Sequence, residues 1–168
     1  MLYSDIINSV LSYSDRQDSE VLNALPMMMN NVVEPMINRY LFIKKTSGRA
    51  TTNAQGLGVY YYDLPSDFLE VRDIKVWTAN TDPTIPASIL YVPTMSSPEQ
   101  IDGSINNNMN QHYAYSIEGT QFRMWPAIVT PAYIEILYYR MVPPINATSP
   151  SNWLSTYYPD VYLFGLIA

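Results

Sequence analysis

Few side chains in this chain are placed to do chemistry. His112 is the only histidine and there is no cysteine, so a histidine-activated nucleophile would have to use that one residue. It follows an asparagine-rich stretch, residues 104–111, that we expect to form a mobile tip. No spacing typical of metal ligands is visible. The sequence therefore predicts no metal site and no cofactor.

Paired carboxylates are the remaining candidates for catalysis. Asp67 with Glu70, or Asp63 with Asp67, could act as acid and base in glycoside hydrolysis. However, Asp63 and Asp67 flank Pro65 in a predicted turn, where Asp is common because its side chain bonds the nearby backbone. This structural explanation is the stronger one. We expect that the protein is not an enzyme.

The composition indicates a packed domain with a surface suited to protein contact. The 168 residues are 48% hydrophobic, enough for a core, but only 14% charged against a usual value of about 25%. Tyrosine, with 15 copies, fills much of the difference. Tyrosine combines a large apolar ring with a polar tip and is enriched at interfaces, although half-buried sheet tyrosines explain the count equally well.

The net charge of −6 argues against wrapping of nucleic acid, because such binding neutralises phosphates with basic residues. An acidic surface suits nucleic acid that must slide past without binding. No run approaches the roughly 18 apolar residues of a membrane span, and no basic segment followed by an apolar run opens the chain. We expect a soluble, unexported protein.

Residues 1–45 carry the apolar spacing of helices. We expect Ser4 or Asp5 to cap a first helix and Asp18 or Ser19 to begin a second one. The second helix has a wide apolar stripe that we assign to the core, formed by Leu25, Met28, Met29, Val32, Val33, Met36, Ile37, Tyr40 and Leu41.

Two prolines interrupt this second helical stretch. Pro26 fits the first turn of a helix, so we expect the helix to restart near Ala24 or Leu25. Pro35 falls inside the periodic pattern, where its ring clashes with the preceding turn, and it predicts a kink.

Residues 59–142 contain strand-like runs separated by turns, and Gly48–Gly58 before them reads as a polar loop. Phe68–Val76 has polar residues on both faces, which favours a strand near a sheet edge. Ala132–Met141 gives the strongest strand signal. The other predicted strands are Ile89–Val92, Tyr113–Ile117 and Gln121–Trp125, the last two joined by a three-residue link, Glu118–Thr120.

Two further helices are predicted. Ser97 and Gln100 match a capping box with Pro98 at the first helical position, so a short helix should follow and end near Gly103. Pro159 and Asp160 begin a terminal helix whose remaining residues, 161–168, are apolar all round. A helix without a polar face must be buried against a core or a partner.

Together these elements predict an α+β protein. An N-terminal helix pair, residues 1–45, packs with a small antiparallel β-sheet and hairpin region, residues 59–142, and with a C-terminal helix, residues 153–168. We expect one domain spanning residues 1–168, with the β-rich part as an insertion.

Two groups of residues are candidate contacts to partners or to a DNA channel. Four of the nine basic residues gather within eleven positions, and their alternative role is to complement a helix C-terminus while remaining solvated. The second group comes from the aromatic C-terminal region. The candidates are Arg39, Lys44, Lys45, Arg49, Trp153, Tyr157, Tyr162 and Phe164.

The order of segments resembles the head-to-tail adaptor proteins of short-tailed bacteriophages, also called tail accessory or head-completion proteins. The first 45 residues match in pattern only. The segments that carry the resemblance are Leu64–Arg72, Tyr91–Pro93, Ser97–Asp102, Tyr115–Pro126, Ile134–Tyr139, Asn152–Leu154 and Tyr158–Gly165. Members of this family usually continue beyond the terminal helix, and contacts made by that extension cannot be assigned to residues of this chain.

The resemblance implies a virion structural protein in the head-tail neck, assembled in the bacterial host cytoplasm. It implies a homo-oligomeric ring, commonly of twelve copies, between the portal protein and the tail nozzle or fibre proteins. Genomic DNA would pass through without specific binding, and no membrane is involved. The alternatives left open are a β-rich tail-fibre or carbohydrate-binding module and a carboxylate glycosidase.

Overall fold

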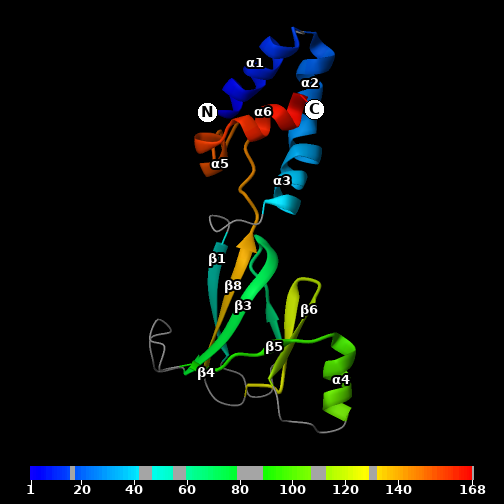
Figure 1. Ribbon diagram of the computed structural model, residues 1–168, viewed down its shortest axis with the longest axis vertical. Coiled ribbons are helices and arrows are strands. Elements are labelled where there is room, and N and C mark those ends of the chain that lie inside the picture. Colours follow the sequence, from blue (N-terminus) through cyan, green and yellow to red (C-terminus); the bar gives the residue numbers. More distant parts are fainter. Residues whose placement is uncertain are drawn as a thin grey trace. The chain divides into compact units, whose positions relative to one another are not determined.

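The computed structural model describes residues 1–15, 18–41, 47–54, 60–78, 89–106, 113–128 and 132–167 (Figure 1). They form two compact units, and the second is inserted between the two segments of the first. Residues 1–46 with 141–168 form the helical unit, and residues 47–140 form the β unit. The predicted α+β class is confirmed, although the strands form two sheets rather than one. Lys44, Lys45, His112 and most of the 104–111 tip lie outside the described residues.

In the helical unit, the first helices start from side-chain contacts that only partly match the prediction. The cap position of α1 is Leu2 rather than Ser4 or Asp5, and the Asp5 carboxylate accepts the Leu2 N–H at 3.0 Å. The predicted start of the second helix is confirmed, because Asp18 caps α2 and accepts the Val21 N–H at 3.0 Å. The helices are α1 (Tyr3–Ser14), α2 (Ser19–Met28), the π-helical η1 (Met29–Val33), α3 (Glu34–Tyr40), α5 (Trp153–Tyr157) and α6 (Asp160–Ile167).

Both prolines are accommodated in one continuous helical path. The predicted restart near Leu25 is wrong, because Pro26 lies inside α2. Before Pro35 the backbone widens into the π turn of η1, where the Glu34 N–H bonds the Met29 carbonyl five residues back. Such π turns interrupt the regular ladder of hydrogen bonds, and here the interruption directly precedes the residue that lacks an N–H.

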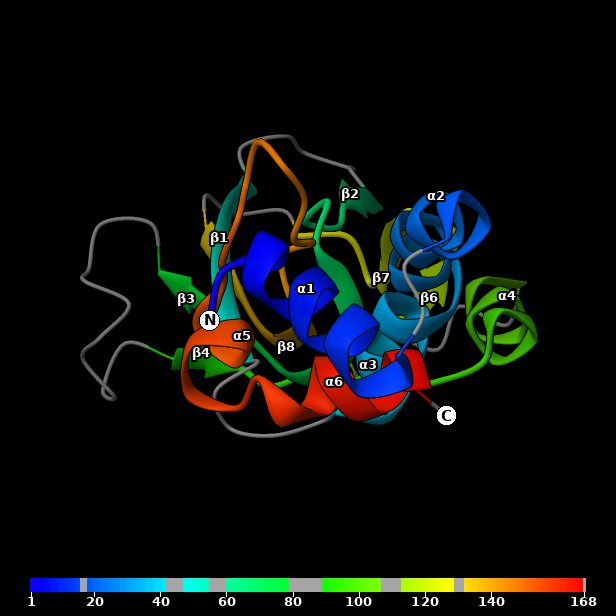
Figure 2. The same ribbon diagram turned by 90° about the horizontal axis from the view of Figure 1, so that it is seen from above.

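The core of the helical unit joins α1, α2, η1, α3, α5 and α6. Close approach of α6 to η1 depends on Gly165, because a Cβ at that position would lie 2.9 Å from Cγ1 of the buried Val33. Figure 2 shows the N-terminus and α5 at one side of this unit and the end of α6 at the other. The buried members of the core are Ile6, Val10, Leu11, Leu25, Met29, Val33, Ile37, Val142, Ile145, Leu154, Tyr162 and Leu166.

Side chains of α3 hold the extended segment that follows the last strand. Val142 and Ile145 are buried and enclose two prolines that have no N–H to donate. The Val142 N–H donates to Asn38 Oδ1 at 2.7 Å, and the Ile145 N–H donates to Glu34 Oε1 at 2.8 Å. Glu34 and Asn38 lie one turn apart on the same side of α3, so they satisfy both buried donors.

The β unit contains two four-stranded sheets (Figure 1). The first has the order β1-β8-β3-β4, and all its pairs are antiparallel. The second has the order β2-β7-β6-β5, with β5 and β6 parallel. The elements are β1 (Ser47–Ala54), β2 (Tyr61–Asp63), β3 (Phe68–Thr78), β4 (Ile89–Tyr91), β5 (Thr94–Met95), α4 (Pro98–Asn106), β6 (Ala114–Glu118), β7 (Gln121–Trp125) and β8 (Ala132–Arg140).

Two strand predictions need correction and a third is confirmed. The polar loop predicted from Gly48 is wrong as far as residue 54, because β1 pairs along its whole length with β8. The predicted position of β3 near a sheet edge is confirmed: β3 is next to the edge strand β4, which pairs only with Val76 and Trp77. The link between β6 and β7 is one residue shorter than predicted: Glu118 pairs with Gln121. Gly119 has φ +65°, which suits the first central position of a type II′ turn.

The core of the β unit uses the alternating faces of its strands. On β8, Ile134, Ile136 and Tyr138 point to one side and are buried. They lie in one cluster with Ile74 and Val76 of β3 and with side chains of the second sheet, including Phe122 and Met124 of β7. Several tyrosines in or directly before strands stack on aromatic neighbours. The ring-centroid distances are 5.6 Å for Tyr60–Trp125, 5.2 Å for Tyr62–Phe122 and 3.5 Å for Tyr91–Tyr113.

Candidate protein-interaction surfaces

The terminal helix α6 is apolar all round but buried on one side only. Tyr162 and Leu166, four residues apart, are 1% and 5% exposed and belong to the helical core. Phe164 is 67% exposed, and Val161 and Ile167 are also exposed. The sequence predicted that this helix is buried against a core or a partner. The side of α6 that carries Tyr162 and Leu166 is buried against the core. The other face leaves a large aromatic ring in water, which favours a partner.

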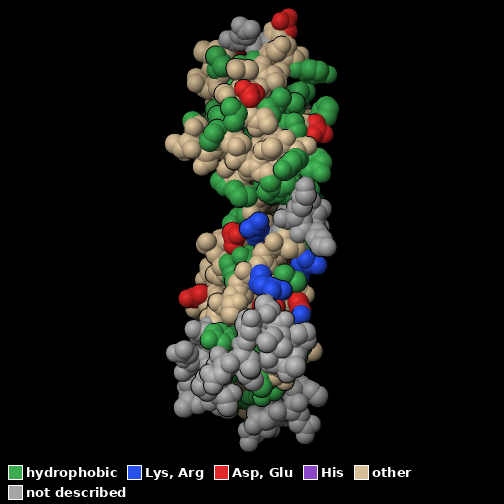
Figure 3. All heavy atoms as spheres, turned by 90° about the vertical axis from the view of Figure 1, so that its left-hand side faces the viewer, with side chains coloured by type: hydrophobic (Ala, Val, Ile, Leu, Met, Phe, Trp, Pro, Cys, Tyr) green, Lys and Arg blue, Asp and Glu red, His purple; other side chains and the backbone are tan. Residues whose placement is uncertain are grey.

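An apolar groove lies between α3 and α6. Its volume is about 280 Å³, and Val161 and Gly165 line its α6 side. Met36 and Tyr40, one turn apart on α3, line the other side and are 54% and 71% exposed. We call the exposed side chains Met36, Tyr40, Val161 and Phe164, together with this groove, the α3–α6 face. Figure 3 views the helical unit from the left-hand side of Figure 1, the side of α5 and the N-terminus, and hydrophobic side chains lie on that surface as well.

Sequence reasoning missed most of this face, because it assigned Met36 and Tyr40 to the core. The signal was the width of the apolar stripe between Leu25 and Leu41. One buried row, at Leu25, Met29, Val33 and Ile37, is enough to fill the core side of the helix. The remaining apolar positions of that stripe must then lie on a second side. Val32, Met36 and Tyr40 are accordingly exposed.

The candidate contact residues separate into exposed and buried side chains. Arg39 is exposed on α3, whereas Arg49 on β1 lies 3.7 Å from Glu135 in an ion pair with its own sheet. Trp153 packs partly buried against the helical core, and Tyr157, in the last turn of α5, is 68% exposed. Tyr162 is a core residue. Its hydroxyl oxygen accepts a hydrogen bond from Asn152 Nδ2 at 2.8 Å, and burial raises its pKa to about 12.

Two of the three carboxylates considered for catalysis, Asp63 and Asp67, form structural hydrogen bonds, and the third, Glu70, is exposed. Asp63 Oδ1 accepts a hydrogen bond from Gln121 Nε2 at 2.7 Å, and Asp67 Oδ1 accepts one from the Tyr138 hydroxyl at 2.8 Å. Burial and this bond to Asp67 raise the pKa of Tyr138 to about 12. Within the described ranges, no three His, Cys, Asp or Glu side chains are grouped to hold a metal ion.

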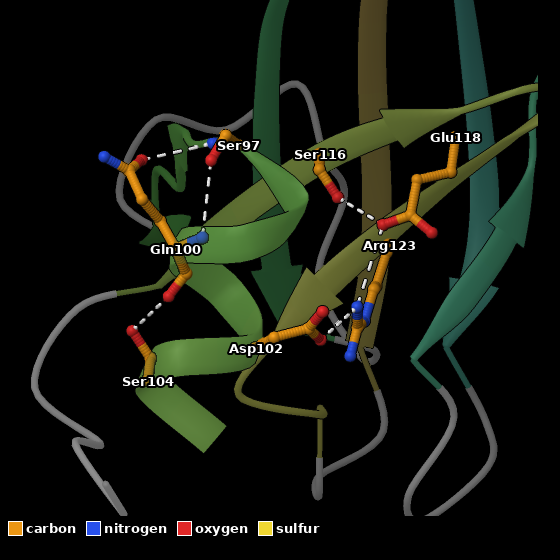
Figure 4. A network of polar contacts seen from close by, with 7 residues as sticks. All are labelled: Ser97, Gln100, Asp102, Ser104, Ser116, Glu118 and Arg123. Atoms are coloured by element: carbon orange, nitrogen blue, oxygen red, sulfur yellow. Dashed lines mark hydrogen bonds and ion pairs between the residues drawn. The ribbon is translucent and has the colours of Figure 1, made fainter. Parts of the chain in front are cut away.

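A polar network fixes α4 to the second sheet (Figure 4). The predicted capping box is confirmed: the Gln100 N–H donates to Ser97 Oγ at 3.3 Å, and the Ser97 N–H donates to Gln100 Oε1 at 3.2 Å. The helix runs to Asn106, three residues beyond the predicted end at Gly103. Arg123 on β7 then bonds Asp102 of α4 at 2.8 Å and lies 3.8 Å from Glu118.

Removing the Arg123 cation should loosen α4. The Arg123 side chain is only 15% exposed, so Arg123→Gln leaves Asp102 and Glu118 without their partly buried partner. We expect the free energy of unfolding to fall by roughly 1–2 kcal/mol and the amides of α4 to exchange faster. Urea unfolding and hydrogen exchange measure both effects. As a matched control, Lys75→Gln removes a cation that is 34% exposed and, among the described residues, pairs only with Asp73, and it should cost at most about 0.5 kcal/mol. Equal losses in the two variants would contradict the role of the network.

Comparison with known proteins gives the class of this molecule. The sequence matches the family model of the SU10 adaptor protein over residues 1–168, and the chain belongs to that family. It is therefore a phage adaptor protein, which is a virion component. A search of curated proteins finds no match. No helix in the described part of the chain is long and apolar enough to cross a bilayer.

Proposed function

We propose that the protein is a head-to-tail adaptor of a short-tailed phage, which forms a ring between the portal and the tail and lines the DNA channel. The observation that carries this proposal is the match to an adaptor family over the whole chain. The exposed α3–α6 face adds physical support. Exposed apolar patches with a groove mark sites of protein contact, and a junction protein must contact neighbours on several sides.

In this proposal the partners are the portal protein, the tail nozzle or fibre proteins and other copies of the chain, twelve in the ring. The candidate contacts are the exposed Arg39, Tyr157 and Phe164, with Lys44, Lys45, Arg49 and Trp153 as further members. The chain acts as one domain of residues 1–168 and assembles in the host cytoplasm. The net charge of −6 per copy repels the phosphate backbone, so DNA slides through without specific binding.

The proposed role involves no catalysis. Asp63 and Asp67 bond side chains of their own sheets, and Asp102 and Glu118 lie against Arg123. Each of these carboxylates therefore has a structural explanation that requires no substrate.

Particles assembled without the protein test this function. A junction that is missing one layer cannot join the layers on either side, so we expect filled heads and free tails in place of complete virions. Electron microscopy counts the two kinds of particle, and supplying the chain in trans should restore joining. Complete, infectious virions formed in its absence would contradict the proposal.

A further inference from the structure

The α3–α6 face combines exposed apolar side chains with an apolar groove. Since burying a Phe or Tyr side chain removes roughly 150–250 Å² from water, Tyr40 and Phe164, at 71% and 67% exposure, leave on the order of 250 Å² of aromatic surface in solvent. The exposed side chains of Met36 and Val161 enlarge this apolar surface, and a groove lies between them. Each partner in a standard interface contributes about 800 Å², so this face can form the apolar centre of one.

Charge indicates what covers this face. The described residues of the helical unit include six acids and one base, Arg39, which lies between Met36 and Tyr40 in sequence. The exposed Asp160 lies one turn before Phe164 on α6, beside the face, and Arg39 forms no ion pair with a described residue. A partner that carries exposed acids beside apolar side chains therefore complements it. The same helical unit offers such a surface.

That surface lies where the start of α1 meets α5. Leu2 is 47% exposed, Tyr157 is 68% exposed, and Asp5 is an exposed acid on the first turn of α1. The N-terminal amine holds the two helices together by donating to the Ser155 carbonyl oxygen at 2.8 Å. We call Leu2, Asp5 and Tyr157 the α1–α5 side. It lies at the opposite side of the helical unit from the end of α6 (Figure 2).

We propose that the α3–α6 face binds the α1–α5 side of a second copy of this chain, with Arg39 against Asp5. The contact is heterologous, because two different surfaces meet, and heterologous contacts that close produce rings. This inference rests on the proposed ring and names its neighbour contact.

A charge exchange tests the contact in the purified full-length chain. Sedimentation velocity over a concentration series should show self-association. Phe164→Glu should weaken it more than tenfold, as expected for a central interface aromatic. Arg39→Glu and Asp5→Lys should each weaken it severalfold, and the double variant should regain most of the wild-type affinity. Because the Asp5 carboxylate also accepts the Leu2 N–H, Asp5→Asn, which keeps an acceptor oxygen and removes only the charge, should weaken association as well. Tyr13→Glu changes an equally exposed aromatic, 75% exposed and outside both surfaces, and should leave association unchanged.

Photo-crosslinking in a mixture of isotopically labelled and unlabelled chains identifies the contacting surface. With the crosslinker at position 164, we expect interchain products at the start of α1 or at α5. A chain that is monomeric at every concentration would overturn the proposed contact, and so would a double variant that associates as weakly as the single variants. Neither result would contradict the proposed ring in the neck. A symmetric product between two α6 helices would also overturn the proposed contact. It would in addition argue against a ring, because a closed two-fold pair cannot extend around a circle.

Discussion

Gly48→Ala should lower the free energy of unfolding by roughly 2–4 kcal/mol, because the new methyl group has no space. A Cβ on Gly48 would lie 2.7 Å from Cζ of Tyr138, its cross-strand partner. The Tyr138 ring cannot easily move away from the new methyl group, because it is buried and its hydroxyl donates to Asp67. Phe68 flanks its ring at a centroid distance of 5.7 Å. Moving the ring would therefore weaken a hydrogen bond to a carboxylate as well as the packing.

Urea unfolding measures this loss, and two further variants identify its cause. Gly103→Ala introduces the same methyl group on α4 where nothing lies within 4 Å, so it should be neutral or stabilise by up to about 1 kcal/mol. In a Tyr138→Leu background the cost of Gly48→Ala should shrink, which a double-mutant cycle reports as a coupling of about 1 kcal/mol or more. Equal effects of Gly48→Ala and Gly103→Ala would show that the close approach to Tyr138 is not the cause.

The double variant Glu34→Ala with Asn38→Ala should lose about 2–6 kcal/mol of stability, because it leaves two buried backbone donors without acceptors. These donors are the N–H groups of Val142 and Ile145, whose side chains are 5% and 0% exposed. Thermal and urea unfolding measure the loss. A change below about 1 kcal/mol would mean that water reaches both amides and that α3 does not hold this segment.

Glu34→Gln separates the acceptor role of this side chain from its charge. Burial raises the pKa of Glu34 above its ordinary value, against the opposing effect of the Ile145 N–H. The folded state therefore binds a proton more tightly than the unfolded state, and the contribution of Glu34 to stability falls as the pH rises through the raised pKa. The amide keeps an acceptor for Ile145 and carries no charge. We expect Glu34→Gln to match or exceed the wild type at pH 7 and to lose this pH dependence. Unfolding measured from pH 4 to pH 8 would contradict this if the two curves ran parallel.

Local signals in the sequence predicted the elements that depend on local chemistry. Asp18 caps α2, and Ser97 with Gln100 forms the capping box of α4, because these hydrogen bonds need only neighbouring residues. The strong strand near the end of the chain was predicted from its β-branched and aromatic residues and is the central strand β8.

Elements that depend on distant partners were not predictable in the same way. Residues 47–54 are polar and contain a glycine, yet they form β1, because β8 offers a complete row of backbone partners. Pro26 sits inside a helix that the packing of Leu25 and Met29 stabilises. The helix from Leu25 to Leu41 has more than one row of apolar side chains, and the tertiary fold determines which row is buried and which forms the α3–α6 face. In the same way, tertiary packing determines that Tyr162 is buried and that Phe164, two residues later on α6, is exposed.

The most direct test of the adaptor proposal is the position and copy number of this chain in its particle. Cryo-electron microscopy of the neck, followed by fitting of the helical unit into the density, measures both. The proposal predicts a single ring of twelve chains below the portal and above the tail, with the α3–α6 face against the adjacent chain. Density for this chain only in fibres or as single copies, or its absence from the neck, would contradict the central claim.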